Sequence, residues 1–266
     1  MGKMGIGGVL LLGLLSMIFG TDFFSLVGGG GAGAPATSEA PINDPQEEET
    51  VQFMSTVLDD AQATWTQEFA QSNLQYREAE LVLFRDSVQS GCGYAQSAMG
   101  PFYCPADQKV YLDLGFFEDL HRRFGAPGDF AQAYVLAHEI GHHVQNLLGV
   151  SGEVRQAQSQ ARSREQANEL SVLLELQADC FAGVWAHTTQ QGRQEAGGPV
   201  LEPGDLEEGL AAAAAVGDDR IQKQATGGVN PETWTHGSSE QRARWFRVGF
   251  ESGDADRCDT FAASGR

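Results

Sequence analysis

The chain has 266 residues, and its 36 acidic against 17 basic residues give a formal net charge of −19. A chain of this length can bury one sizeable core, and nothing in it requires a second domain of comparable size. Nucleic-acid binding needs clustered Lys and Arg, which this sequence lacks, so nucleic acid is excluded as the expected partner. The surplus of carboxylates predicts a well-solvated surface.

Residues 1–27 predict an N-terminal membrane anchor. Residues 5–19 carry no charge, and the apolar run resumes as far as Val27, which approaches the ~20 residues that span a hydrocarbon core. Lys3 precedes the run, so the positive-inside rule places the N-terminus in the cytoplasm and the rest of the chain outside. A cleaved signal peptide is the alternative, since residues 34–36 (Ala-Pro-Ala) are loosely similar to a cleavage site.

Residues 28–49 predict a flexible linker, because they are Gly-rich, contain proline and end in a run of glutamates. The folded domain should then occupy residues 50–266. Its hydrophobic periodicity predicts an α+β class that is mainly helical with a small sheet. We expect a loop between two strands, at residues 81–84 and 110–114, and helices at residues 51–72, 116–124, 131–148, 165–187, 206–225 and 240–250.

Residues 138–142 read His-Glu-Ile-Gly-His, an HExxH motif within the helix expected at 131–148. Positions four apart share one face of a helix, so the imidazoles of His138 and His142 can reach a single metal ion. Glu139 can contact a metal-bound water without being a ligand. Two histidines on a solvated helix face are the alternative, but the flanking residues are apolar, and buried polar groups without partners are costly. The motif predicts a zinc site with Glu139 as general base.

Catalytic zinc needs a third protein ligand and an open position for water. Glu175 is the best candidate, with a surface carboxylate as the alternative. Asp179 lies four residues further on the same helix face, where it can accept the second N–H of a ligating histidine. His143 should point to a different face from His142, and we expect it to position other groups rather than bind metal. His121 and His187 stand alone, without a partner pattern, and we expect structural roles for both.

The four cysteines contain no CxxC pair, so a four-Cys zinc cluster has little support. Outside the cytoplasm they should form two disulfides, for which three pairings are possible. We favour Cys92 with Cys104, which flank one Gly-rich loop, and this leaves Cys180 for Cys258. The second bridge would pin the C-terminal tail to the helix that carries Glu175. A buried free thiol is the alternative for Cys180.

Several segments together resemble the bacterial neutral zinc metallopeptidase family. The similarity covers nearly the whole chain from the apolar run onward, and it is carried by residues 138–145 (HEIGHHVQ), 175–183 (ELQADCFAG), 91–93 (GCG), 100–105 (GPFYCP) and 235–239 (THGSS). It implies a membrane-anchored protein with a zincin-like, gluzincin-type domain in which two histidines and a downstream glutamate hold zinc. The glycine-rich stretch that precedes the anchor in that family is absent here.

A second similarity concerns the C-terminal part of the chain. Thr235 and His236, with Arg242 six residues on, look like the Thr-His-Pro…Arg element of membrane-bound zinc endopeptidases of the CAAX-processing and heat-shock types. Gly237 stands where those enzymes have proline. The resemblance implies that His236 and Arg242 lie beside the zinc and stabilise the oxyanion. An ordinary loop histidine is the alternative for His236.

The sequence therefore predicts a membrane-anchored zinc metallopeptidase with one zinc per chain and a peptide or protein substrate. The alternative is a membrane-tethered binding or assembly protein that keeps zinc for structure alone. Retention of Glu139 beside a three-ligand site favours the enzyme. Hydrolysis of a non-peptide amide stays open as a third interpretation. The strand at 110–114 is either an edge to which an extended substrate adds or an internal strand.

Overall fold

The computed structural model describes residues 45–117, 120, 128–195 and 204–264. The anchor expected at residues 1–27, the linker up to residue 44, His121 and most of the helix expected at 116–124 lie outside this part of the chain. No helix within the described ranges is both long and apolar enough to cross a bilayer.

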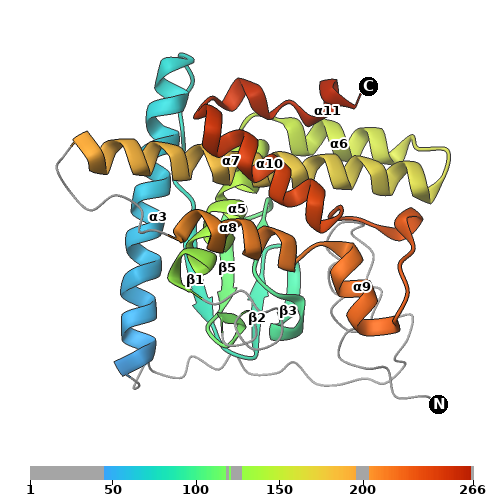
Figure 1. Ribbon diagram of the computed structural model, residues 1–266, viewed down its shortest axis with the longest axis horizontal. Helices are drawn as coiled ribbons and strands as arrows, with labels where there is room; N and C mark the ends of the chain where they lie inside the picture. The colour runs from blue at the N-terminus through green and yellow to red at the C-terminus, as the bar shows by residue number, and fades with distance from the viewer. Residues whose placement is uncertain (1–44, 118–119, 121–127, 196–203, 265–266) are drawn as a thin grey trace.

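Helices make up most of the structure, and a small sheet lies in the lower middle of the view in Figure 1. The α-helices are α3 (Pro45–Gln71), α5 (Asp129–Leu147), α6 (Val150–Ser159), α7 (Arg164–Glu195), α8 (Asp205–Ala215), α9 (Asp218–Thr226), α10 (Ser239–Ser252) and α11 (Thr260–Ala263). Short 3₁₀ turns are η1 (Ser97–Met99), η2 (Pro231–Thr233) and η3 (Ala255–Cys258). The strands are β1 (Glu80–Phe84), β2 (Ser87–Ser90), β3 (Gly93–Gln96), β4 (Phe102–Cys104) and β5 (Lys109–Asp113). The expectation of a mainly helical α+β domain with a small sheet is confirmed.

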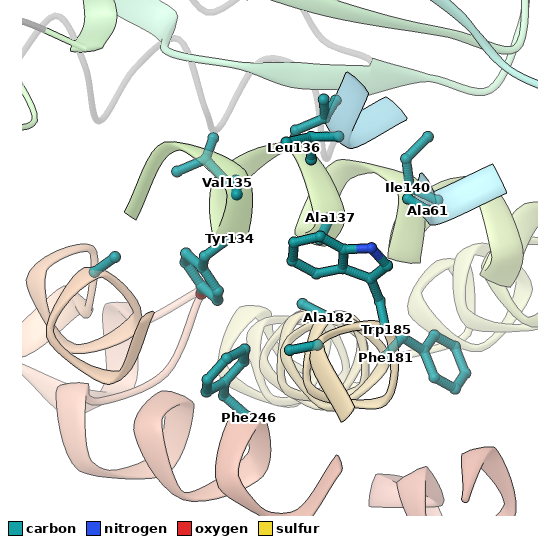
Figure 2. Packing of buried hydrophobic residues seen from close by; sticks show 14 of the residues in the cluster. Ala61, Tyr134, Val135, Leu136, Ala137, Ile140, Phe181, Ala182, Trp185 and Phe246 are labelled. Atoms are coloured by element: carbon teal, nitrogen blue, oxygen red, sulfur yellow. The ribbon is translucent and has the colours of Figure 1, made fainter. Parts of the chain in front are cut away.

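The helical core is built around α5. Its apolar face packs against α3, α7 and α8, and α7 runs across the molecule in Figure 1 with α3 crossing one end. Figure 2 shows Tyr134 and Ile140 of α5 in this core with Trp185 of α7 and Phe246 of α10. Burial of a large apolar side chain stabilises a fold by about 1.5–3 kcal/mol, so these contacts hold α5 between its neighbours. The central helix is thereby fixed in position.

The three-stranded sheet has the order β1-β5-β4, with β1 parallel and β4 antiparallel to β5. The strand expected at 110–114 therefore lies inside the sheet, and β4 is an edge among the described strands. This decides between the two interpretations of that strand in favour of the internal one. The prediction of a loop between the two expected strands is wrong in part, because this segment contains the β2–β3 hairpin and β4. Its strands are only three or four residues long, too short for hydrophobic alternation to be read from the sequence.

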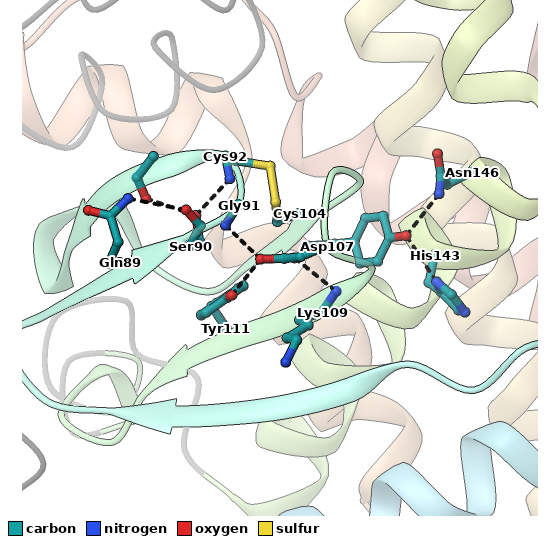
Figure 3. The surroundings of a disulfide bond; sticks show 12 residues. Gln89, Ser90, Gly91, Cys92, Cys104, Asp107, Lys109, Tyr111, His143 and Asn146 are labelled. Atoms are coloured by element: carbon teal, nitrogen blue, oxygen red, sulfur yellow. Dashed lines mark hydrogen bonds between the residues drawn. A yellow bond between two sulfur atoms is a disulfide. The ribbon is translucent and has the colours of Figure 1, made fainter.

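A disulfide joins this hairpin to the sheet. Cys92 lies in the β2–β3 turn and is bonded to Cys104 of β4, the pairing favoured from the sequence. Asp107 reinforces the link, because its carboxylate accepts hydrogen bonds from the Gly91 N–H over 2.6 Å and from the Tyr111 hydroxyl over 2.6 Å (Figure 3). The hairpin is thus held to β4 by the disulfide and to Asp107 by one hydrogen bond, and Asp107 is in turn held to β5 through Tyr111.

Three expected helices differ from the structure. The one expected at 51–72 begins at Pro45, so residues 45–49, expected to be the end of the linker, are helical. The segment expected as one helix at 206–225 is divided into α8 and α9 at Gly217. A Cβ at Gly217 would lie 2.4 Å from the Ser239 nitrogen, so the break occurs where the chain passes directly against the start of α10. The polar segment before the helix at 165–187 contains a further helix, α6, which buries only Val154 among its residues and so shows little apolar periodicity. The longer α7 extends to Glu195.

Helices α7 and α10 pack with their backbones in contact at two glycines. A Cβ at Gly249 would lie 1.9 Å from the Cys180 carbonyl oxygen, and one at Gly183 would lie 2.1 Å from the Phe246 carbonyl oxygen. Both obstacles are backbone atoms, which cannot turn aside as a flexible side chain can. The close approach therefore requires glycine at both positions.

Gly249→Ala is expected to lower the free energy of unfolding by about 1–3 kcal/mol, the usual cost of overpacking a core. Gly192→Ala on α7 is the matched control, because its added Cβ meets no atom within 4 Å. That control should stabilise the helix by roughly 0.5–1 kcal/mol. Denaturant unfolding of both variants measures the difference, and equal stabilities would contradict the packing.

Candidate metal centre

Helix α5 carries both histidines of the HExxH motif on the side that faces α7. The helix starts after Gly128, which has a φ of 111°, and ends before Gly149, which is left-handed with a φ of 85°. Within it, His138 and Glu139 are buried. The rings of His138 and His142 lie edge to face with centroids 4.7 Å apart, as expected for positions separated by one helical turn.

Helix α7 brings Glu175 to the same point from a distant part of the sequence. Its Oε2 lies 3.3 Å from His138 Nε2, and its Oε1 lies 3.4 Å from His142 Nε2. The three donor atoms all fall within 4.8 Å of one another, close enough to hold one metal ion. Two imidazoles and a carboxylate are a donor set that zinc accepts at catalytic sites.

Each histidine uses its second ring nitrogen in a contact that directs Nε2 toward the site. His138 Nδ1 donates to Asp179 Oδ1 over 2.8 Å, since an ionised carboxylate can only accept. His142 Nδ1 lies 2.9 Å from Gln145 Oε1. Both Nε2 atoms are therefore left to face Glu175 and each other. Histidines that bind metal are held in this way, so the residues fit a zinc ion.

Asp179 lies at the centre of a buried polar cluster. Arg242 donates from Nε to Asp179 Oδ2 over 2.8 Å and from Nη2 to Oδ1 over 2.9 Å, and the Tyr134 hydroxyl donates to Oδ1 over 2.5 Å. Burial alone would raise the pKa of Asp179, but Arg242 and His138 hold it below its ordinary value. Asp179 is thereby kept ionised as the acceptor for His138.

The charges of the ligand cluster depend on one another. Burial would raise the pKa of Glu175, but His142 and His138 hold it well below its usual range. Burial lowers the pKa of His138, and Asp179 and Glu175 more than offset this and raise it to about 9. The two carboxylates thus make the centre a strong site for positive charge, whether protons or a metal cation.

His236 forms a pair with Asp218, the first residue of α9. Its Nδ1 lies 3.2 Å from Asp218 Oδ1, while Asp218 Oδ2 accepts the backbone N–H groups of Thr235, His236 and Gly237 over 2.7–3.1 Å. Burial lowers the pKa of His236, but the Asp218 carboxylate raises it above the ordinary value. The buried Nε2 of His236 has no hydrogen-bond partner among the described residues, which leaves it available to a bound molecule.

A cavity of about 420 Å³ opens over the three candidate ligands. Glu139, His236, Asp218 and Arg242 line it together with His138, His142 and Glu175. Residues 99–103 around β4 form part of its wall. Its volume lies within the range of ligand-binding pockets in proteins.

His143 and Asn146 connect α5 to the wall of the cavity. The Tyr103 hydroxyl on β4 contacts His143 Nδ1 over 3.0 Å and accepts from Asn146 Nδ2 over 3.0 Å (Figure 3). His143 Nε2 also donates to the Arg77 carbonyl oxygen over 2.6 Å. The helix that carries the two candidate histidine ligands thus holds β4 in place through its adjacent face. His187 similarly links α7 to α10 through the Phe250 carbonyl oxygen.

The structure brings together every residue that the sequence predicted for the site, but it gives Arg242 a different main contact. Its guanidinium binds Asp179 with two hydrogen bonds and also donates to the Val216 carbonyl oxygen, while Glu175 lies 3.9 Å away. The second disulfide joins Cys180 of α7 to Cys258, the pairing that the sequence favoured.

Three residues of the site were missed in the sequence: Tyr134, Gln145 and Asp218. Tyr134 lies four residues before His138 and Gln145 lies three residues after His142, so helical spacing was a usable signal for both. Asp218 had no such signal, because it reaches His236 from another helix.

Comparisons with known proteins agree with this site. The family model described as "Putative neutral zinc metallopeptidase" matches residues 1–261. Uncharacterized protein YpfJ of Escherichia coli (strain K12) is 48% identical over 264 residues, which cover 98% of this chain and 88% of that protein. Uncharacterized protein Rv2575 of Mycobacterium tuberculosis (strain ATCC 25618 / H37Rv) is 54% identical over 195 residues, 71% of this chain and 64% of that protein. No solved structure matches the chain. The chain belongs to the putative neutral zinc metallopeptidase family.

Proposed function

We propose that this protein is a zinc metallopeptidase that hydrolyses peptide bonds. The observation that carries the proposal is the convergence of His138, His142 and Glu175 beside the acidic Glu139 in an open cavity. A closed structural zinc site usually takes all four ligands from the protein, whereas this group offers three. When bound, zinc would lower the pKa of a coordinated water toward neutrality and polarise the scissile carbonyl.

The residues around the ligands supply the proton transfers and the charge stabilisation. Glu139 takes a proton from the attacking water and delivers it to the leaving amine. His236, kept protonated by Asp218, donates its Nε2–H to the oxyanion of the tetrahedral intermediate. Asp179, clamped by Arg242 and Tyr134, orients His138. Arg242 acts in this proposal through Asp179 rather than on the substrate.

The substrate is expected to lie along β4. Among the described strands β4 is at the edge of its sheet, and residues 100–103 line the cavity. An extended peptide can add to such an edge through backbone hydrogen bonds. We also propose that residues 1–27 anchor the chain in the membrane and that the domain lies outside the cytoplasm. The two disulfides support an oxidising compartment.

Glu139→Gln tests the proposed function. The variant is expected to bind about one zinc per chain, as the unchanged protein does, because Glu139 is not a ligand. Its hydrolysis of a fluorescence-quenched peptide library should fall by about 10²–10⁴-fold, the usual contribution of a general base. Glu153→Gln, an exposed position on α6, serves as the control and should keep full activity.

Two results would contradict the proposal. Undiminished hydrolysis by Glu139→Gln would remove Glu139 from the mechanism. A zinc-loaded, folded wild-type protein that cleaves no member of the library would favour the alternative, a zinc-binding interaction protein.

Asp218→Asn is expected to move the pH dependence of hydrolysis. Asp218 raises the pKa of His236, so its removal lowers that pKa, and the protonated imidazole is lost at a lower pH. The alkaline limb of the kcat/KM profile should therefore shift toward acid. The fall in kcat at neutral pH should not exceed about 10²–10³-fold, the cost of removing an oxyanion donor. An unshifted alkaline limb would separate Asp218 and His236 from the chemistry.

A further inference from the structure

Two glutamine side chains lie buried between α5 and α7. Gln145 is fully buried and Gln177 is 8% exposed. Gln145 Nε2 donates to the Leu174 carbonyl oxygen over 2.7 Å and to Gln177 Oε1 over 3.1 Å. A buried amide is costly unless its polar atoms are satisfied, and these two bonds use both N–H groups of Gln145.

These bonds fix which end of the Gln145 amide faces the metal centre. Flipping the amide would bring its oxygen against the carbonyl oxygens of Leu174 and Gln177, so Oε1 must face His142. Because Oε1 can only accept, His142 Nδ1 is the donor over 2.9 Å. In the neutral ring, the nitrogen that carries the lone pair is then Nε2, which faces Glu175 Oε1 at 3.4 Å. The glutamine amide thus selects the tautomer that can bind a metal.

The other end of this connection is held by a disulfide. Gln177 Nε2 donates to the Cys258 carbonyl oxygen over 3.1 Å. Cys258 is bonded to Cys180, which lies three residues after Gln177 on α7, and both cysteines are fully buried. The acceptor for Gln177 is therefore tied covalently to the helix that carries Gln177 itself. The polar connection runs unbroken from His142 through Gln145 and Gln177 to the C-terminal bridge.

The two histidine ligands are consequently held by different chemistry. His138 donates to an ionised carboxylate that is clamped by Arg242, whereas His142 donates to a neutral amide. An anionic acceptor makes an imidazole a stronger electron donor than a neutral one does. The neutral Gln145 amide therefore adds little electron density to the His142 ring, and its contribution is to orient that ring.

We propose that Gln145 and Gln177 form an amide relay that sets the tautomer and orientation of His142 and that the Cys180–Cys258 bridge anchors this relay. The relay rests on the metal centre of the proposed function but not on hydrolysis. It assigns positioning roles to two glutamines, and it makes the C-terminal segment part of the support of the metal site.

Gln145→Leu tests the relay through zinc affinity, measured by competition with a chromophoric chelator. The change removes the acceptor for His142 and keeps the side-chain size, so the affinity should fall by about 10–100-fold, the usual effect of losing such a partner. Gln62→Leu is the matched control, because Gln62 is also buried, its Oε1 accepts the Ala79 N–H over 2.7 Å, and it is not part of the candidate ligand group. That control should lose stability without losing zinc affinity. Equal affinities in the two variants would overturn the relay.

A second readout follows the ring protons directly. In ¹⁵N NMR spectra of the zinc-loaded protein, the Nδ1–H protons of His138 and His142 should both be protected from exchange. In Gln145→Leu the His142 signal should be lost while that of His138 persists. Persistence of both signals would overturn the assignment of Gln145 as the acceptor.

Gln177→Leu keeps the proposal testable if Gln145→Leu does not fold. It leaves the contact between Gln145 and His142 in place and removes the anchor, so zinc affinity should fall by less than in Gln145→Leu but by more than in Gln62→Leu. An affinity equal to that of Gln62→Leu would overturn the relay. Wild-type protein that binds no zinc would instead contradict the proposed function, and this distinguishes the two failures.

Discussion

Replacing both His138 and His142 with Ala is expected to abolish zinc binding. Metal analysis should find about one zinc per chain in the unchanged protein and none in the double variant, because only Glu175 of the three donors would remain. Hydrolysis should disappear with the metal. Added zinc should raise the unfolding temperature of the wild-type protein but not that of the variant, since a ligand stabilises only the state that binds it.

His187→Ala is the matched control for this result. His187 bonds to the Phe250 carbonyl oxygen and to Gln191, away from the ligand cluster. The control should lose some stability but keep one zinc per chain. Full zinc content in the His138→Ala, His142→Ala variant would remove the proposed site altogether.

The parts of the site that were predictable depend on spacing within one helix. His138, Glu139 and His142 lie on α5 at HExxH spacing, and the pair Glu175 and Asp179 repeats the same four-residue separation on α7. Such patterns are local, so a sequence contains them in full. The prediction that α5 and α7 meet at one site was not local. It rested on the family resemblance and on the need of catalytic zinc for a third ligand.

The parts that were missed depend on contacts between distant segments. Asp218 reaches the backbone of residues 235–237 only because Gly217 allows α9 to start against α10. The break between α8 and α9 is therefore set by tertiary packing, whereas the alanine-rich sequence favours a continuous helix. The β2–β3 hairpin was missed for a related reason, since Asp107 and the Cys92–Cys104 bridge hold strands too short to show periodicity.

Arg242 lies where the resemblance implied, but its contacts point to a different role. Resemblance implied an arginine beside the metal, and Arg242 does line the cavity. Its two short hydrogen bonds nevertheless go to Asp179, which is 0% exposed. A guanidinium that pairs with a buried carboxylate through two bonds is committed to that carboxylate. The two roles, oxyanion stabilisation and support of Asp179, predict different behaviour of an Arg242 variant.

Arg242→Leu is expected to lower the free energy of unfolding by about 3–5 kcal/mol, because it leaves the Asp179 carboxylate buried without its counter-charge. The pKa of Asp179 should rise, since Arg242 is the foremost of the groups that hold it down against burial. A protonated Asp179 is a weaker acceptor for His138, so zinc affinity should fall together with stability. Arg242→Lys keeps the charge but not the planar guanidinium. Its stability and zinc affinity should therefore lie between those of the unchanged protein and those of Arg242→Leu.

Arg244→Leu provides the control, because Arg244 is exposed on the same helix and its loss should change stability by no more than about 0.5 kcal/mol. Denaturant unfolding of the metal-free proteins and chelator competition on the loaded ones measure the two effects separately. If Arg242 instead acted on the oxyanion alone, its Leu variant would keep wild-type stability and zinc affinity and lose only kcat. That outcome would return Arg242 to the role implied by resemblance and leave Asp179 dependent on Tyr134 and His138.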